Sequence, residues 1–126
     1  MIDATGARAA VDLFRASGLH PICCTITGGE REKHHEGREY SVPKAQLISG
    51  FDMMYRTGAL EVVHDLPDRE QAEEELQNFR RRIGATGRAT YAAAEGAHDD
   101  TIMSISMACW WAKKRRGVTR EVPLRI

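Results

Sequence analysis

Gly96-Ala97-His98-Asp99-Asp100-Thr101 leads directly into an apolar segment, Ile102 to Ala112, and this junction is the most informative part of the chain. It places two carboxylates and an imidazole at the start of a helix that is apolar nearly all round. A single aspartate is enough to satisfy free backbone N–H groups and to complement the positive end of the helix dipole. The second carboxylate and His98 therefore indicate a role for this helix start beyond capping.

The composition is that of a globular chain with no bias toward one class of partner. Its 126 residues are enough for a domain with its own core, and 42% hydrophobic with 29% charged residues exclude a disordered chain. The formal net charge of zero predicts no global attraction to nucleic acid or membrane, although local basic faces remain open.

Cysteine usage and hydropathy predict the compartment. Cys23, Cys24 and Cys109 form no Cys-x-x-Cys pair, so we expect buried, reduced thiols. The N-terminus has no signal-peptide pattern, and no apolar run approaches the ~18 residues of a membrane span. We therefore expect a cytoplasmic protein without membrane contact.

Apolar periodicity and turn residues predict helices that alternate with short strands. The expected order is strand 1–3, helix 9–17, strand 20–27, mobile loop 28–41, helix 43–56, strand 59–63, helix 67–83, strand 88–93, helix 99–116 and tail 117–126. Such alternation implies an α/β domain over residues 1–116 whose mostly parallel sheet is covered on both faces, with 117–126 as a peripheral tail.

Acidic residues fall where a parallel sheet places its ligands. Asp3 ends the first predicted strand and Asp99–Asp100 open the last helix, so both can lie at the carboxyl edge of the sheet. Clustered carboxylates repel each other, and a hard cation such as Mg²⁺ or Mn²⁺ removes that penalty. Two such ions about 4 Å apart can promote phosphodiester cleavage. Helix capping and solvated surface charge remain the open alternative for the same residues.

Six short motifs occur in order along the chain: Ile2–Gly6, Thr25–Gly29, Val42–Lys44, Glu75–Leu76 with Phe79, Glu95–Asp100 and Ala108–Ala112. Together they resemble the C-terminal nuclease domain of phage large terminase subunits and the prophage-borne relatives of that domain. The resemblance runs over about residues 1 to 112.

This resemblance implies an RNase H-like three-layer α/β/α fold and Mg²⁺- or Mn²⁺-dependent cutting of double-stranded DNA during genome packaging, in a bacterial host. Asp3 matches the second of the three acidic metal positions of the family. The Asp99–Asp100 pair matches the third, with Asp100 expected as a ligand and Asp99 as its support or as a helix cap. His98 is expected to orient a carboxylate or to approach the scissile phosphate.

Four basic residues are candidates for contact with DNA phosphates: Lys44, Arg80, Arg81 and Lys113. The alternative is that Arg80–Arg82 and Lys113–Arg116 are ordinary solvated helix ends. Besides double-stranded DNA, the resemblance implies other packaging proteins as partners.

The chain departs from the family at its beginning. The first acidic position precedes the strand of Asp3 and is not among these residues, and no phosphate-binding loop of an ATP-hydrolysing motor is present. We therefore expect an N-terminally truncated fold with impaired catalysis, and whether the chain is an enzyme stays open. The alternatives are a catalytically inactive prophage remnant that binds DNA or protein, and an assembly module. A truncated sheet also predicts an exposed edge through which two copies can pair.

Overall fold

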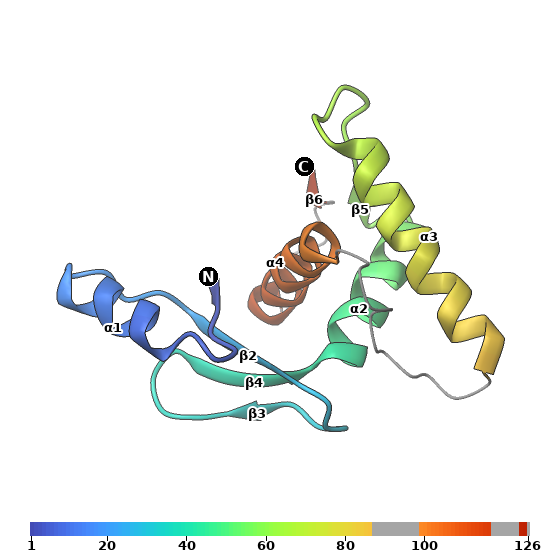
Figure 1. The fold of residues 1–126 in the computed structure, drawn as a ribbon. Coiled ribbons are helices and arrows are strands. Elements are labelled where there is room, and N and C mark those ends of the chain that lie inside the picture. The colour runs from blue at the N-terminus through green and yellow to red at the C-terminus, as the bar shows by residue number, and fades with distance from the viewer. Residues whose placement is uncertain (87–98, 117–123, 126) are drawn as a thin grey trace. The chain divides into compact units, whose positions relative to one another are not determined.

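The computed structural model describes residues 1–86, 99–116 and 124–125, with side chains for 1–78 and 99–115. Within these ranges the chain is mixed α/β, with four helices and a small, mostly parallel sheet (Figure 1). It divides into two compact units, Met1–Gln46 and Leu47–Ile126.

Unit 1 is built on a four-stranded sheet with the order β1-β2-β4-β3. The strands are β1 (Ile2–Asp3), β2 (Cys23–Thr27), β3 (Lys33–His34) and β4 (Glu39–Pro43). β1, β2 and β4 are parallel, and β3 runs antiparallel to β4. The register pairs Asp3 with Cys24 and Thr27 with Pro43, so β2 lies between β1 and β4 and pairs with both.

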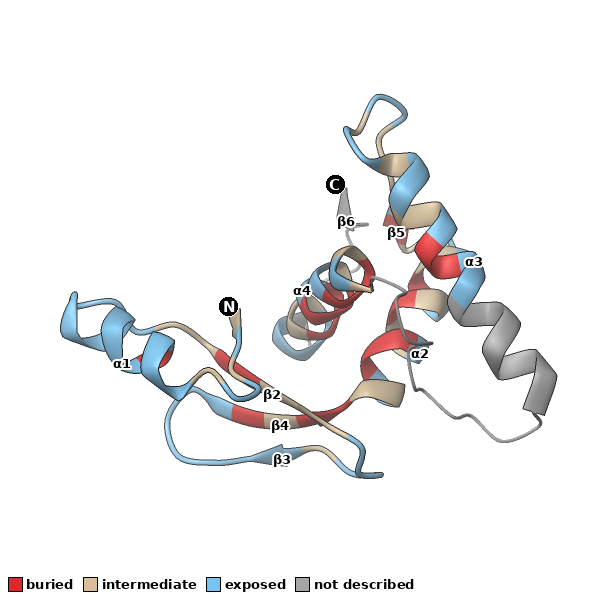
Figure 2. Cartoon of the chain, viewed as in Figure 1, coloured by how far each residue is buried: buried red, intermediate tan, exposed pale blue. Residues whose placement is uncertain are grey.

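The core of unit 1 lies along β2 and β4, where Cys23, Cys24, Tyr40 and Val42 are buried (Figure 2). The predicted strand 20–27 is confirmed as β2. The predicted helix 9–17 is confirmed as α1 (Arg8–Ala16), which connects β1 to β2. Glycine in the left-handed region lets the chain turn on both sides of this helix, at Gly6 (φ +67°) and at Gly18 (φ +77°). Of the apolar side chains on α1, Val11 is buried.

The prediction of one mobile loop over 28–41 is wrong. The segment contains β3 and the first residues of β4, joined by a turn in which Gly37 has a φ of +62°. His34 stacks on Tyr40 across the two strands, with ring centroids 4.4 Å apart. Charged residues around this turn outnumber the apolar residues that face the core of unit 1. The sequence pattern therefore did not predict β3 or the start of β4.

Unit 2 contains most of α2 (Lys44–Arg56), together with β5 (Leu60–Glu61), α3 (Arg69–Thr86), α4 (Asp100–Arg116) and β6 (Leu124–Arg125). β5 and β6 pair in parallel, so the end of the predicted tail adds a short strand beside residues 60–61. The predicted helices 43–56, 67–83 and 99–116 are confirmed within a few residues at each end. The predicted strand 88–93 lies outside the described residues.

The hydrophobic core of unit 2 joins one face of each of its three helices. Its buried members are Phe51, Met54, Leu60, Leu76, Ile102 and Cys109. Ile102 and Cys109 are seven positions apart, two turns along α4, which places both on the same face of that helix. None of the helices in the described ranges is long and apolar enough to cross a membrane.

Candidate functional site

Asp3 stands at the carboxyl end of β1 and is exposed to solvent. The backbone N–H of Thr5 donates a hydrogen bond to Asp3 Oδ1 at 2.8 Å. The hydroxyl of Thr5 in turn accepts the backbone N–H of Ile26 on β2, also at 2.8 Å. The turn that follows β1 is therefore tied to the neighbouring strand. This turn holds one oxygen of Asp3 in place and leaves Oδ2 able to bind a cation.

The thiol next to Asp3 in the sheet is unsuited to metal binding or nucleophilic attack. Cys24 is 0% exposed, and this burial, together with the negative charge of Asp3, raises the pKa of the thiol to about 11. Burial likewise raises the pKa of Cys109 to about 11. All three cysteines are free and buried, which confirms the prediction of buried, reduced thiols. Any chemistry at this strand end thus depends on oxygen ligands.

The start of α4 presents two carboxylates in different settings. Asp99 is partly buried and immediately precedes the helix, where its backbone carbonyl accepts the N–H of Met103 at 2.9 Å. This bond gives Asp99 the N-cap position. Asp100 is the first residue of α4 and is exposed. Asp99 thus caps the start of the helix, and the carboxylate of Asp100 is exposed beside it.

A third carboxylate, which the sequence analysis named only within a motif and gave no role in the site, lies at the same helix start. Glu75 on α3 is only 6% exposed, and its Oε2 accepts the backbone N–H of Ile102 at 2.9 Å. Its Oε1 accepts the side-chain amide of Gln71, one turn earlier on α3, at 3.1 Å. The i, i+4 spacing of Gln71 and Glu75 was visible in the sequence, but the bond to Ile102 spans 27 positions and has no local signature.

The remaining predicted residues are dispersed. His98 lies outside the described residues, and Arg80 and Arg81 lie on α3 without described side chains. Lys44, the first residue of α2, is partly buried. Lys113 is exposed in the last turn of α4.

Within the described residues, the structure brings Asp99 and Asp100 together at one helix start. Asp3 belongs to the other unit. No group of three or more His, Cys, Asp or Glu side chains in those ranges is arranged to hold a metal ion.

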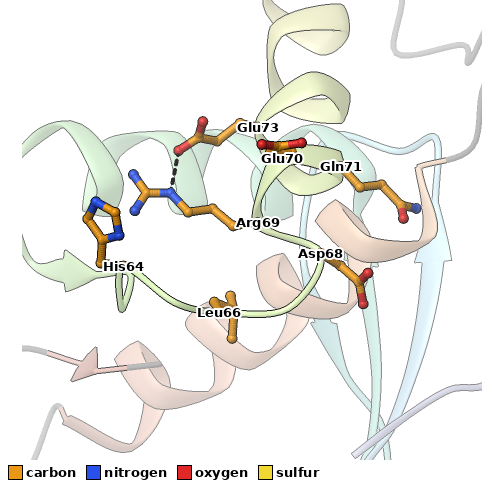
Figure 3. A pocket seen from close by; sticks show the side chains of 7 residues that line it. All are labelled: His64, Leu66, Asp68, Arg69, Glu70, Gln71 and Glu73. Atoms are coloured by element: carbon orange, nitrogen blue, oxygen red, sulfur yellow. Dashed lines mark hydrogen bonds and ion pairs between the residues drawn. The ribbon is translucent and has the colours of Figure 1, made fainter.

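An open hollow at the N-terminus of α3 is a weaker candidate. It has a volume of about 660 Å³ and is lined by His64, Leu66, Asp68, Arg69, Glu70, Gln71 and Glu73. Figure 3 shows that Arg69 pairs with Glu73, whereas the side chains of Asp68 and Gln71 turn away from that pair. Its polar groups therefore do not converge on one point, as they do in specific ligand sites.

Comparison of the chain with protein-family models, with curated proteins and with solved structures gave no match in any of the three.

Proposed function

We propose that the protein is a metal-dependent endonuclease of RNase H-like fold that acts on double-stranded DNA. The observation that carries the proposal is the position of Asp3, an exposed carboxylate at the carboxyl end of a strand in a parallel sheet. Ligand sites in parallel sheets form at that edge. The resemblance to phage terminase nucleases assigns a metal-binding role to the same residue.

The donor atoms suit Mg²⁺ or Mn²⁺. Both cations prefer carboxylate oxygens and water, and the proposal assigns them to Asp3 and Asp100, with Asp99 as the helix cap. A bound divalent cation would supply Lewis-acid activation for phosphodiester hydrolysis. The side chains would hold the cation and direct it toward a scissile phosphate, and His98 would orient one carboxylate or approach that phosphate.

Contact with the DNA backbone is proposed for Lys44, Arg80, Arg81 and Lys113. Lys113 is exposed at the C-terminal end of α4, where cations are also favoured by the helix dipole. Contacts of this kind bind phosphates without reading sequence, so they would make binding strongly dependent on salt.

A second candidate function is an assembly module that binds protein rather than cutting DNA. The observation that favours it is the apolar surface around α1, where Leu13 is 70% exposed and Leu19 is 55% exposed. Exposed apolar side chains are typical of binding surfaces where they form a contiguous patch. Among the described strands β1 lies at one edge of its sheet, and pairing of two copies along that edge belongs to the same proposal. Light scattering would detect such pairing as a dimer.

Nicking of supercoiled plasmid DNA in Mn²⁺ tests the nuclease proposal. We expect the wild-type chain to nick the plasmid slowly, in line with the impaired catalysis expected from its sequence, and we expect EDTA or the substitution Asp100→Asn to abolish nicking. The control is Asp65→Asn, which changes another exposed aspartate of unit 2 and should leave nicking unchanged. Nicking that survives Asp100→Asn would contradict the proposal. DNA or protein binding without any cleavage by the wild type would favour the assembly module.

A further inference from the structure

We infer that Glu75 is a positioning residue for the Asp99–Asp100 carboxylates, an inference that rests on the proposed metal-dependent function. Glu75 does not need to touch the metal or the DNA for this role. Its carboxylate holds the first turn of α4 against α3, and that turn carries both aspartates.

Burial sets Glu75 apart from its neighbours on α3. Glu74 is exposed and Glu73 is partly exposed, as expected for a helix surface, whereas Glu75 is 6% exposed beside the core residue Leu76. A buried carboxylate is unfavourable unless hydrogen bonds replace its water. Among the described residues, those bonds come from the backbone of Ile102 and the side chain of Gln71. The buried carboxylate of Glu75 therefore depends on the first turn of α4 for one of its two hydrogen bonds.

The bond between Glu75 and Ile102 is of a strong type. A carboxylate that accepts a backbone N–H at a helix N-terminus gains from the charge of the acceptor and from the helix dipole. Ile102 follows Asp100 by two residues and is itself 0% exposed. With the amide of Ile102 bonded to α3 and its side chain in the core of unit 2, the first turn of α4 has little freedom to rotate.

Fixed geometry matters for the proposed ligands. Mg²⁺ demands near-octahedral coordination at about 2.0–2.1 Å, so a ligand whose backbone moves loses affinity. Residues that orient metal ligands typically change metal affinity by about 10–100-fold when they are substituted. We expect a loss of that size when the oxygen of Glu75 is removed, without any change in Asp99 or Asp100.

Glutamine at this position separates the hydrogen bond from the charge. In Glu75→Gln, the side-chain oxygen can still accept the N–H of Ile102, and its amide can pair with Gln71 once the amide of Gln71 is reversed. Glu75→Ala removes both hydrogen bonds. Glu74→Ala is the matched control, because it removes an exposed carboxylate one position earlier on the same helix. If Glu75→Ala does not fold, Glu75→Met keeps the bulk of the side chain without an oxygen.

The experiment combines calorimetric titration with Mn²⁺ and amide hydrogen exchange by NMR, on the 126-residue chain. We expect Glu75→Ala to weaken Mn²⁺ binding by about 10–100-fold and to speed the exchange of the Ile102 amide. The amide of Met103, which bonds to the backbone of Asp99, is the internal reference. Glu75→Gln and Glu74→Ala should resemble the wild type in both measurements.

Three results would overturn the inference, and a fourth would refute the proposed function on which it rests. Unchanged exchange at Ile102 in Glu75→Ala means that Glu75 does not hold the turn. Faster exchange with wild-type Mn²⁺ affinity means that Glu75 is only structural. Equal losses in Glu75→Gln and Glu75→Ala mean that charge, not the hydrogen bond, matters. Failure of the wild type to bind Mn²⁺ instead refutes the proposed function, and the exchange data then still show whether Glu75 holds the turn.

Discussion

Thr5 replaces β1 as the partner of β2 beyond the point where β1 ends. β1 stops at Asp3, but β2 continues to Thr27, so no strand among the described residues lies opposite the Ile26 N–H on that side. It donates instead to the hydroxyl of Thr5 at 2.8 Å. The substitution Thr5→Val keeps the shape of the side chain and removes this acceptor, and Thr5→Ser keeps the acceptor.

The expected cost of Thr5→Val follows from the setting of that hydrogen bond. A neutral hydrogen bond contributes about 0.5–1.5 kcal/mol to stability, and the full penalty of a buried unpaired group does not apply where water can reach the donor. Thr5 is exposed and Ile26 is only partly buried, so we expect a loss of about 0.5–1 kcal/mol. The bond from the Thr5 amide to Asp3 is a backbone donation, and both variants retain it.

Urea denaturation measures this loss as a lower midpoint with an unchanged slope. Hydrogen exchange should show faster exchange of the Ile26 amide in Thr5→Val, with Thr5→Ser close to the wild type in both assays. A Thr5→Val protein as stable as the wild type, with unchanged exchange at Ile26, would refute the idea that Thr5 completes the edge of β2.

Two further predictions concern the buried core. Ile102→Ala should lower the free energy of unfolding by about 2–5 kcal/mol in urea, because Ile102 is 0% exposed; Met53→Ala, at a 47% exposed position on α2, should cost less than about 0.5 kcal/mol. Stability should also fall as the pH rises from 9.0 toward about 11, because Cys24 and Cys109 keep their protons in the folded state over a range in which the unfolded thiols ionise. Serine at both positions should flatten this pH dependence, and rapid reaction of the native thiols with a disulfide reagent at pH 8 would contradict the burial that causes it.

Helices were the most predictable part of the chain. The spacing of Leu47, Ile48, Phe51 and Met54 predicted α2, and all four are buried. The apolar segment after Asp100 predicted α4 in the same way. β4 was missed because its inward residues, Tyr40 and Val42, alternate with polar ones after a strongly charged turn. Three of its five residues are buried, but the third is Pro43, which we expected at the start of the next helix. The two remaining buried residues are too weak a signal against that background.

The candidate site was predictable only in its local parts. That Asp3 ends a strand and Asp100 opens a helix could be derived from neighbouring residues. The role of Glu75 could not be derived in this way, because its carboxylate accepts the amide of Ile102 on another helix, 27 positions away. The motif Glu75–Leu76 gave this residue no role in the site, and only packing shows which of the acidic residues on α3 is buried.

The proposed nuclease function assigns both Asp3 and Asp100 to a divalent cation. A double-substitution cycle of Asp3→Asn and Asp100→Asn, with Mn²⁺ affinity measured by calorimetry, tests it most directly. If both are ligands of one ion, each single variant should lose most of the affinity, and the double variant should lose little more, because coupled residues are not additive. Wild-type affinity in Asp3→Asn would contradict the claim, and strictly additive losses would assign the two aspartates to separate sites.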